Sequence, residues 1–214
     1  MTIRVLIADD HKVVADGLSH LLSAHEGIEV VGMARSGREA VRRAVDLDPD
    51  VILMDSNMAD LNGIEATRQL RERGTRAHVI MLSVHAEAPH VVRALRAGAT
   101  GYVPKSSAGT DVIEAIETVN TGKRYLHPSI AHEVLDQLVE SEAAEDPVSR
   151  LSSRERQVLQ LIAEGNAASE IASRLSLSVR TVETYRARLM EKLDIRDVPT
   201  LVKFAIRHGL ASLE

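Results

Sequence analysis

The chain of 214 residues contains no cysteine and no tryptophan, and aromatic residues make up only 2% of it. Without cysteine it can form neither a disulfide framework nor a thiolate zinc site. The scarcity of aromatic side chains argues against nucleic-acid binding by base stacking. The apolar runs are far too short to cross a bilayer, and the N-terminus has no basic segment followed by a hydrophobic signal core. We therefore expect a soluble, cytoplasmic protein without a membrane partner.

The net charge of −5 is unevenly distributed along the chain. Residues 1–148 carry 15 basic and 23 acidic side chains, which gives a net charge of −8. Residues 149–214 carry 11 basic and 8 acidic side chains, which gives +3. The C-terminal part is therefore the better candidate for binding a polyanion.

The first 122 residues alternate between short apolar runs and longer stretches with helical spacing. Short runs rich in β-branched residues are typical of buried parallel strands. The alternation predicts an α/β domain with a doubly wound, five-stranded parallel sheet of the flavodoxin-like type and helices on both faces. The expected strands lie near residues 3–8, 28–34, 50–54, 77–82 and 100–103. The expected helices lie near residues 13–25, 37–47, 63–73, 87–97 and 109–121.

The pattern changes after residue 122. A helix is possible over 127–138. The segment 140–147 is acidic, lacks large apolar residues and ends in a proline, which is typical of a solvated linker. We therefore predict a first domain over 1–122, a linker over 123–148 and a second domain over 149–214.

The second domain is predicted to be a small all-α unit of four helices. A serine hydroxyl can cap a helix by accepting a hydrogen bond from a backbone N–H of the first turn. Serines stand at the expected starts of the first three helices, so we predict that they cap them. Only three residues, 176–178, separate the two middle helices, which is the tight corner of a helix-turn-helix. The predicted caps are Ser152 or Ser153, then Ser169, then Ser178.

Polar residues follow four of the expected strands. Asp9 and Asp10 come after the first, Asp55 after the third, Ser83 after the fourth and Lys105 after the fifth. The carboxyl ends of parallel strands meet at one edge of a sheet, so these side chains should converge. Three carboxylates repel one another unless they hold a cation, and the lysine suggests that an anion binds beside it.

This set suits a magnesium-assisted phosphoryl site. Mg²⁺ prefers oxygen ligands, which Asp10 and Asp55 can supply directly, Asp9 through a water molecule and Asn57 through its backbone carbonyl. An aspartate at a strand end can also be a nucleophile that forms an acyl phosphate. Taken singly, an aspartate after a strand is as readily a helix cap, and a loop lysine is usually only solvated. The joint pattern is much less easily explained by capping.

Residues 1–120 resemble the receiver domain of two-component response regulators. The resemblance is carried by Asp9-Asp10-His11, by Met54-Asp55 with the block 61–66, by 82–85 and by 98–105, which ends in Tyr102-Val103-Pro104-Lys105. It implies that Asp55 is the phosphoacceptor, loaded by a sensor histidine kinase. It also implies that Ser83 and Lys105 contact the phosphoryl group and that Ser83 and Tyr102 form the switch pair. Taken alone, Tyr102 would be a half-buried strand aromatic with its hydroxyl in water.

Two positions depart from the family pattern. Ala59 stands where the family usually has proline, and the loss of a fixed φ should make this loop more flexible without removing a ligand. Pro104 precedes Lys105, whereas the family often has proline after the lysine. By the resemblance, Asn57 and His85 flank the attacking water and tune dephosphorylation.

The segment from Leu151 to Leu193 resembles the LuxR-type helix-turn-helix. Its motifs include Leu151-Ser152-Ser153-Arg154-Glu155, Glu170-Ile171-Ala172 and Lys192-Leu193. The whole chain resembles the NarL/FixJ class of response regulators. This resemblance implies a transcription factor, not an enzyme, whose binding to double-stranded promoter DNA is controlled by Mg²⁺-dependent phosphorylation of Asp55. A homodimer is expected on activation, with the helix over 200–208 as a dimerising face unless its apolar residues are all internal.

The expected helix over 179–193 should place its N-terminal positions in the major groove. Glu183 and Thr184 are the candidates for base edges, and the basic and hydroxyl side chains suit phosphates. The same charges could instead form a solvated helix face with pairs such as Glu183 and Arg186. The predicted DNA-binding residues are Arg180, Thr181, Glu183, Thr184, Tyr185, Arg186, Arg188 and Lys192, with Tyr185 replacing a common histidine.

Two other functions remain open at this point. An aspartyl-phosphate enzyme of the haloacid dehalogenase type would have its acids as Asp-x-Asp, whereas here they are adjacent, and no phosphate-binding loop of the Gly-Lys-Ser/Thr type is present. A DNA-binding regulator whose receiver is no longer switched by phosphate is compatible with Ala59.

Overall fold

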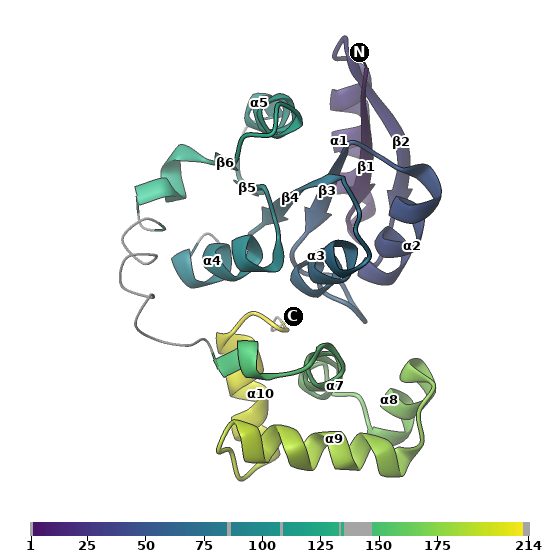
Figure 1. The fold of residues 1–214 in the computed structure, drawn as a ribbon, viewed down its shortest axis with the longest axis vertical. Helices are drawn as coiled ribbons and strands as arrows, with labels where there is room; N and C mark the ends of the chain where they lie inside the picture. Colours follow the sequence, from purple (N-terminus) through teal and green to yellow (C-terminus); the bar gives the residue numbers. More distant parts are fainter. Residues whose placement is uncertain (1, 85–86, 108, 133, 135–146, 212–214) are drawn as a thin grey trace. The chain divides into compact units, whose positions relative to one another are not determined.

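A computed structural model describes residues 2–84, 87–107, 109–132, 134 and 147–211. The chain divides into two compact units, Met1–Glu140 and Ser141–Glu214. Each unit is described by itself (Figure 1).

The first unit contains a parallel sheet with the strand order β2-β1-β3-β4-β5-β6. The strands are β1 (Ile3–Ala8), β2 (Ile28–Ala34), β3 (Val51–Asp55), β4 (His78–Ser83), β5 (Gly101–Pro104) and β6 (Tyr125–Leu126). The helices between them are α1 (Lys12–Ser23), α2 (Gly37–Leu47), α3 (Gly63–Glu72), α4 (Ala88–Ala97) and α5 (Gly109–Asn120). The predicted α/β class is confirmed.

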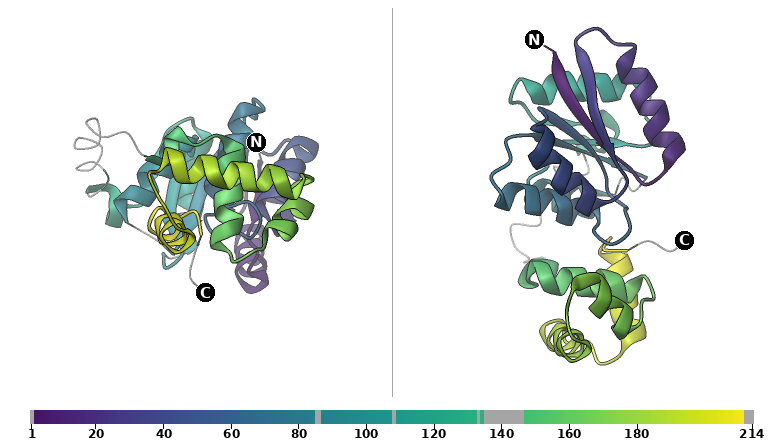
Figure 2. Two further views of the ribbon diagram at one scale, coloured as in Figure 1. Left: turned by 90° about the horizontal axis from the view of Figure 1, so that it is seen from below. Right: turned by 90° about the vertical axis from the view of Figure 1, so that its right-hand side faces the viewer.

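Alternating side chains of the strands build two separate cores, one on each face of the sheet. Leu6, Ile52 and Met81 pack with residues of α2, α3 and α4. Ile7 and Leu53 belong to the other core, together with residues of α1 and α5. Every residue of the central strand β3 is buried, as expected for a strand covered on both faces (Figure 2).

The sheet has six strands, not the predicted five. The sixth consists of only Tyr125 and Leu126, which pair with Gly101 and Tyr102 of β5. Two residues are too few for a periodic apolar pattern, so the sequence carried no strand signal there. Beyond β6, residues 128–132 and 134 are helical, whereas the rest of the predicted helix over 127–138 and most of the acidic segment lie outside the described residues.

The second unit is helical, as predicted. It begins with a short 3-10 helix, η1 (Pro147–Arg150), followed by α7 (Ser153–Ala163), α8 (Ala168–Leu175), α9 (Val179–Lys192) and α10 (Val198–Arg207). One apolar core joins the four α-helices through residues such as Leu159, Ile171, Leu189 and Leu201.

Serine caps begin two of these helices. The Ser152 hydroxyl accepts from Glu155 N–H, and the Glu155 carboxylate accepts from Ser152 N–H, which together form a capping box. The Ser178 hydroxyl accepts from Thr181 N–H. The predicted Ser169 cap is wrong because the N-cap of α8 lies two residues earlier, at Ala167, whose N–H donates to the Glu170 carboxylate.

Among the described residues, no helix is long and apolar enough to cross a membrane.

Two glycines make room for the loop between β3 and α3. A Cβ on Gly63 would lie 2.0 Å from the Asp55 carbonyl oxygen, and one on Gly37 would lie 2.1 Å from the Leu61 carbonyl oxygen. Real Cβ atoms do not approach backbone this closely, so the path of the loop depends on both glycines. The end of β3 and the start of α3 are therefore in direct contact.

We expect Gly63→Ala to destabilise the first unit by about 1–3 kcal/mol, because the added methyl group must push the end of β3 aside. Gly17→Ala is the matched control, since a Cβ at this exposed helical site would meet no atom within 4 Å apart from its chain neighbours and the backbone of its own helix. That control should be neutral or stabilising by up to about 1 kcal/mol. Urea unfolding followed by circular dichroism measures both, and equal stability of the two variants would contradict the proposed crowding.

Candidate functional site

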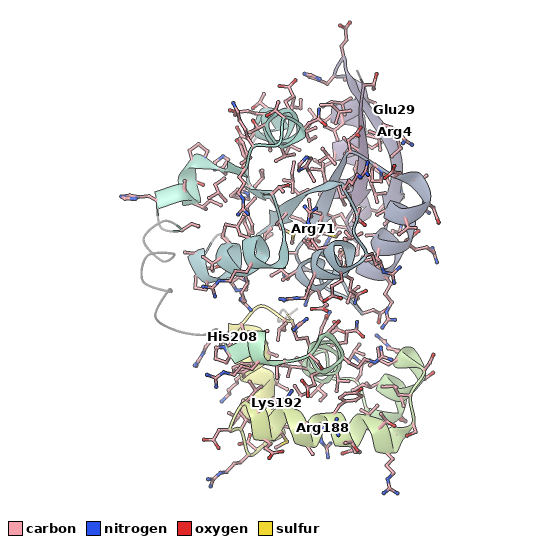
Figure 3. The ribbon with its side chains drawn as sticks, viewed as in Figure 1. Arg4, Glu29, Arg71, Arg188, Lys192 and His208 are labelled. Carbon is pink, nitrogen blue, oxygen red and sulfur yellow. The ribbon has the colours of Figure 1, made fainter. Side chains whose placement is uncertain are left out.

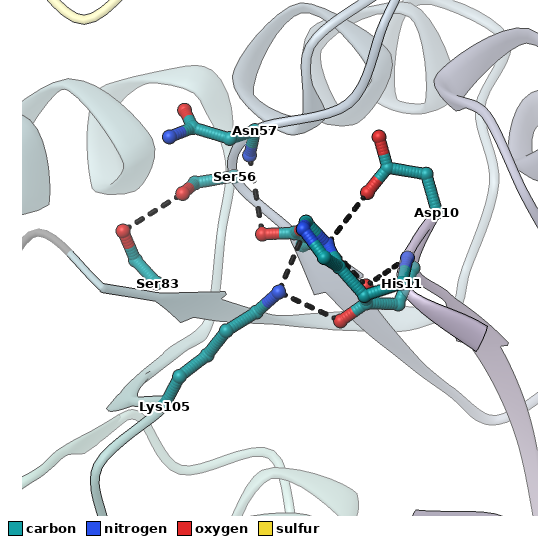
Figure 4. A network of polar contacts seen from close by, with 8 residues as sticks. Asp10, His11, Ser56, Asn57, Ser83 and Lys105 are labelled. Atoms are coloured by element: carbon teal, nitrogen blue, oxygen red, sulfur yellow. Dashed lines mark hydrogen bonds and ion pairs between the residues drawn. The ribbon is translucent and has the colours of Figure 1, made fainter. Parts of the chain in front are cut away.

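Three predicted residues meet at the carboxyl edge of the sheet. Asp9 follows β1, Asp55 ends β3 and Lys105 follows β5. The Lys105 ammonium lies 2.8 Å from Asp9 Oδ2 and 2.8 Å from Asp55 Oδ2. Figure 4 shows Lys105 reaching into this network of polar contacts. The neighbouring order of β1, β3, β4 and β5 in the sheet brings together residues nearly 100 positions apart in the sequence.

Both carboxylates are buried. Asp9 is 0% exposed and Asp55 is 2% exposed. Burial raises the pKa of Asp55 from 3.8 to about 6, and the nearby Asp9 adds to the rise, while Lys105 and the Asn57 N–H act against it. Burial also disfavours the charge of Lys105, but its hydrogen bonds to Asp55 and Asp9 outweigh this and raise the pKa of the ammonium. The site therefore holds more negative than positive charge in a place with little water.

Donor atoms for a metal ion lie beside this ion pair. Carboxylate oxygens of Asp9, Asp10 and Asp55 and Nδ1 of His11 all lie within 4.8 Å of one another. Nδ1 of His11 is 2.9 Å from Asp10 Oδ1 and 3.2 Å from Asp9 Oδ1. Three carboxylates form the donor set that a hard divalent cation prefers, so the residues fit such an ion.

His11 was not among the predicted ligands. The sequence could have indicated His11 as a further donor, because it directly follows Asp9 and Asp10 in the turn after β1, at the same carboxyl edge of the sheet. The turn is fixed by His11 N–H, which donates to Asp9 Oδ1 at 2.8 Å. Asn57, predicted as a carbonyl ligand, donates its own N–H to Asp55 Oδ1 at 3.2 Å.

The two predicted switch residues lie on neighbouring strands. Ser83 ends β4 and Tyr102 lies in β5, and each is 1% exposed. The Tyr102 hydroxyl shares a hydrogen bond with Ser83, and burial raises the pKa of Tyr102 to about 12. A half-buried Tyr102 with its hydroxyl in water is therefore excluded. His85 lies outside the described residues.

The loop after β3 makes a tight turn at Ala59, the position where the receiver family usually has proline. Leu61 N–H donates to the Ala59 carbonyl at 2.8 Å, which leaves Asp60 at the centre of a three-residue turn. Asp60 has φ 68°, a left-handed conformation that costs a residue other than glycine about 1 kcal/mol or more. The loop thus contains local strain close to Asp55.

In the second unit, five of the predicted DNA-binding residues share one hollow on α9. The hollow is lined by two guanidinium groups and several hydroxyl groups, a combination suited to phosphate oxygens. Ser178 caps the helix at its edge. The lining residues are Ser178, Arg180, Thr181, Thr184, Tyr185 and Arg188.

The other three predicted residues of this helix are engaged within the domain. Arg186 pairs with Glu183 one turn away. Lys192 pairs with Glu155 of α7 at 2.7 Å. Figure 3 labels Lys192 on α9, together with Arg188 of the hollow. Burial opposes the charge of Glu155, but hydrogen bonds from Lys192 and Ser152 outweigh it and lower the pKa of this carboxyl. Lys192 therefore supports the helix packing in this structure.

Comparison with known proteins adds independent information. Residues 5–117 match the family described as response regulator receiver domain, and residues 149–205 match that described as bacterial regulatory proteins, luxR family. The chain is similar to response regulator UvrY of Escherichia coli K12, with 40% identity over 212 residues that cover 99% of this chain and 97% of UvrY. It is also similar to response regulator GacA of Pseudomonas aeruginosa, with 38% identity over 208 residues and 97% of each chain covered.

A similar fold occurs in a solved structure of the two-component response regulator RcsB in complex with DNA. The TM-score is 0.60 and the identity is 26%, over 95% of this chain and 98% of that chain.

The raised pKa of Asp55 predicts a pH-dependent stability. Between pH 3.8 and about 6 the folded protein binds the Asp55 proton more tightly than the unfolded chain does, so this group's contribution to stability falls as pH rises through that window. Asp55→Asn cannot titrate, so we expect it to lose this slope and to be about 1–3 kcal/mol more stable than the parent above pH 6. Urea unfolding over this pH range in a chelating buffer measures it. Parallel profiles for parent and variant would contradict the prediction.

Proposed function

The chain belongs to the two-component response regulators of the NarL/FixJ class, with a receiver and a LuxR-type DNA-binding domain, and on this premise we propose that phosphorylation of Asp55 controls its binding to promoter DNA. The proposal rests above all on the contact of one ammonium, that of Lys105, with both Asp55 and Asp9. A sensor histidine kinase supplies the phosphoryl group. Because its target is double-stranded promoter DNA, the protein acts in the bacterial cytoplasm.

The chemistry uses groups at the edge of the sheet. The Asp55 carboxylate attacks the phosphorus of a phosphohistidine, and the P–N bond breaks as the P–O bond forms, which releases the kinase's imidazole. With a pKa of about 6, Asp55 is mostly ionised at neutral pH and so available as the nucleophile. Lys105 neutralises charge on the phosphoryl oxygens, and the Ser83 hydroxyl donates to one of them.

A magnesium ion fits the same edge. Asp10, Asp55 and the Asn57 carbonyl would hold it, with Asp9 acting through water and His11 beside them. When bound, the ion supplies positive charge to the transferring phosphoryl oxygens. The family consists of transcription regulators, so we propose no turnover beyond acyl-phosphate formation and its slow hydrolysis.

The switch pair links this chemistry to assembly. A shift of Ser83 and Tyr102 changes the surface formed by β4, α4, β5 and α5, and the proposed result is a homodimer on DNA. In α10, Leu201 and Ala205 are 0% exposed and belong to the domain's own core. Val202 also packs against that core, but Val202 and Ile206 are only partly buried, so their exposed surface remains for a dimer contact.

The helix α9 carries the proposed DNA contact. RcsB, a solved relative, is bound to DNA in its complex. The hollow that contains Arg180 and Arg188 has the chemistry for phosphates, while Glu183 and Thr184 remain the candidates for base edges. Two recognition helices in a dimer would bind half-sites about one helical turn apart.

A regulator with an uncoupled receiver is the second candidate, because the loop with Ala59 and the strained Asp60 lies close to Asp55. Under that alternative DNA binding would not change on phosphorylation.

Treatment with acetyl phosphate tests the phosphoryl chemistry. We expect intact-mass spectrometry to detect one added phosphoryl group in the parent protein with Mg²⁺ and none without it. Asp55→Asn should remain unmodified because it lacks the nucleophile. No phosphoryl group on the parent would refute phosphorylation control in its simple form, whereas a modified parent with unchanged DNA binding would favour the uncoupled receiver.

Arg188 and Lys192 should separate DNA contact from domain stability. Arg188→Ala should weaken binding to duplex DNA and lower the slope of log K against log salt by about 1. Lys192→Ala should instead cost about 1–3 kcal/mol of stability, because the buried Glu155 loses its partner. The control is Lys203→Ala, an exposed lysine of α10.

Fluorescence anisotropy with labelled duplex DNA and urea unfolding give the two readouts. A Lys192→Ala protein of parental stability that lost one unit of salt slope would reverse the assignment of that residue.

A further inference from the structure

Three hydroxyl groups lie in a row across the strands beside the phosphoryl site. The Ser56 hydroxyl donates to Ser83 Oγ at 2.7 Å, and Ser83 in turn shares a hydrogen bond with the Tyr102 hydroxyl. Figure 4 shows the first of these bonds, between Ser56 and Ser83. The three residues are 7%, 1% and 1% exposed, so water competes little for these bonds.

The register of the sheet produces this row. Asp55 of β3 pairs with Leu82 of β4, and Ser56 N–H donates to the Leu82 carbonyl at 2.9 Å. The next residues along the chain, Ser56 directly after β3 and Ser83 at the end of β4, therefore stand opposite each other. Ser83 pairs in turn with Pro104 of β5, two residues after Tyr102. Ser56 is thus the one group of the three that directly follows the phosphoacceptor in the chain.

We propose that Ser56 is a positioning residue, which holds the Ser83 hydroxyl toward β3 and thereby favours the buried orientation of Tyr102. The inference rests on the proposed function, in which Ser83 and Tyr102 form the switch. Both partners of the Ser56–Ser83 bond are side chains of this chain, so the bond requires no phosphoryl group. Ser56 thus holds the Ser83 hydroxyl by a hydrogen bond before phosphorylation, as a phosphoryl oxygen on Asp55 would hold it after transfer.

The switch pair therefore favours the buried orientation of Tyr102 even before Asp55 is phosphorylated. A single net hydrogen bond changes an equilibrium by roughly two- to tenfold. Loss of the Ser56 hydroxyl should therefore lower the ratio of buried to exposed Tyr102 by about that factor. Phosphorylation of such a variant should restore the buried orientation, because the phosphoryl oxygen then holds Ser83.

Tyrosine itself can report this equilibrium. The chain has three tyrosines and no tryptophan, so labelling with 3-fluorotyrosine gives few fluorine resonances, and Tyr102→Phe identifies that of Tyr102. Broadening by a dissolved paramagnetic probe measures the exposure of the ring. The variants are Ser56→Ala and the matched pair Ser56→Thr and Ser56→Val, which have equal volume and differ in the hydroxyl group.

Unchanged resonances of Tyr125 and Tyr185 serve as the control for folding. We expect Ser56→Ala and Ser56→Val to raise the probe-induced broadening of Tyr102 by two- to tenfold and Ser56→Thr to match the parent. A Tyr102 signal that is the same in Ser56→Thr and Ser56→Val would overturn the inference, even if Ser56→Ala were poorly folded. These spectra need no phosphoryl donor, whereas intact mass on the same samples tests phosphorylation, so the inference and the proposed function can fail separately.

Discussion

The ion triplet of Asp9, Asp55 and Lys105 is the constraint that organises the carboxyl edge of the sheet in the first unit. Two buried carboxylates are tolerated here because one ammonium lies 2.8 Å from each of them. The three residues follow or end β1, β3 and β5, so the triplet also ties three strands together at one edge. The same carboxylates leave an excess of negative charge at this edge, which a divalent cation held by them would offset. Fold and chemistry are therefore coupled through one lysine side chain.

Crowding and strain surround this triplet. The loop after β3 is confined by Gly37 and Gly63, which leave no space for a methyl group, and it passes through the left-handed Asp60. Such confinement limits where the acceptor carboxylate can move. In the second unit an ion pair restrains the helix α9, because Lys192 at its C-terminal end pairs with Glu155. The N-terminal end of the same helix presents Arg180 and the hydroxyl groups of the hollow.

Much of the site could be predicted because parallel strands bring their carboxyl ends together. This rule alone placed Asp9, Asp55 and Lys105 at one edge, and the succession of strand and helix patterns along the chain predicted a sheet with helices on both faces. The rest depended on tertiary contacts that leave no periodic signal. The short strand β6 pairs through two residues only, and the partner of Lys192 lies 37 positions away on another helix. The bond between Ser56 and Ser83 required the register of β3 against β4, which the sequence does not encode locally.

The pairing of Lys192 with Glu155 also restricts how this DNA-binding domain can be re-engineered. The carboxylate belongs both to the capping box of α7 and to the ion pair with α9, so one side chain joins two helices. A recognition helix transplanted from another protein would need a cation at its last position to match this carboxylate. Residues at the N-terminal half of α9 are free of that requirement. Specificity can therefore be exchanged by grafting the first turns of the helix while its last turn is kept.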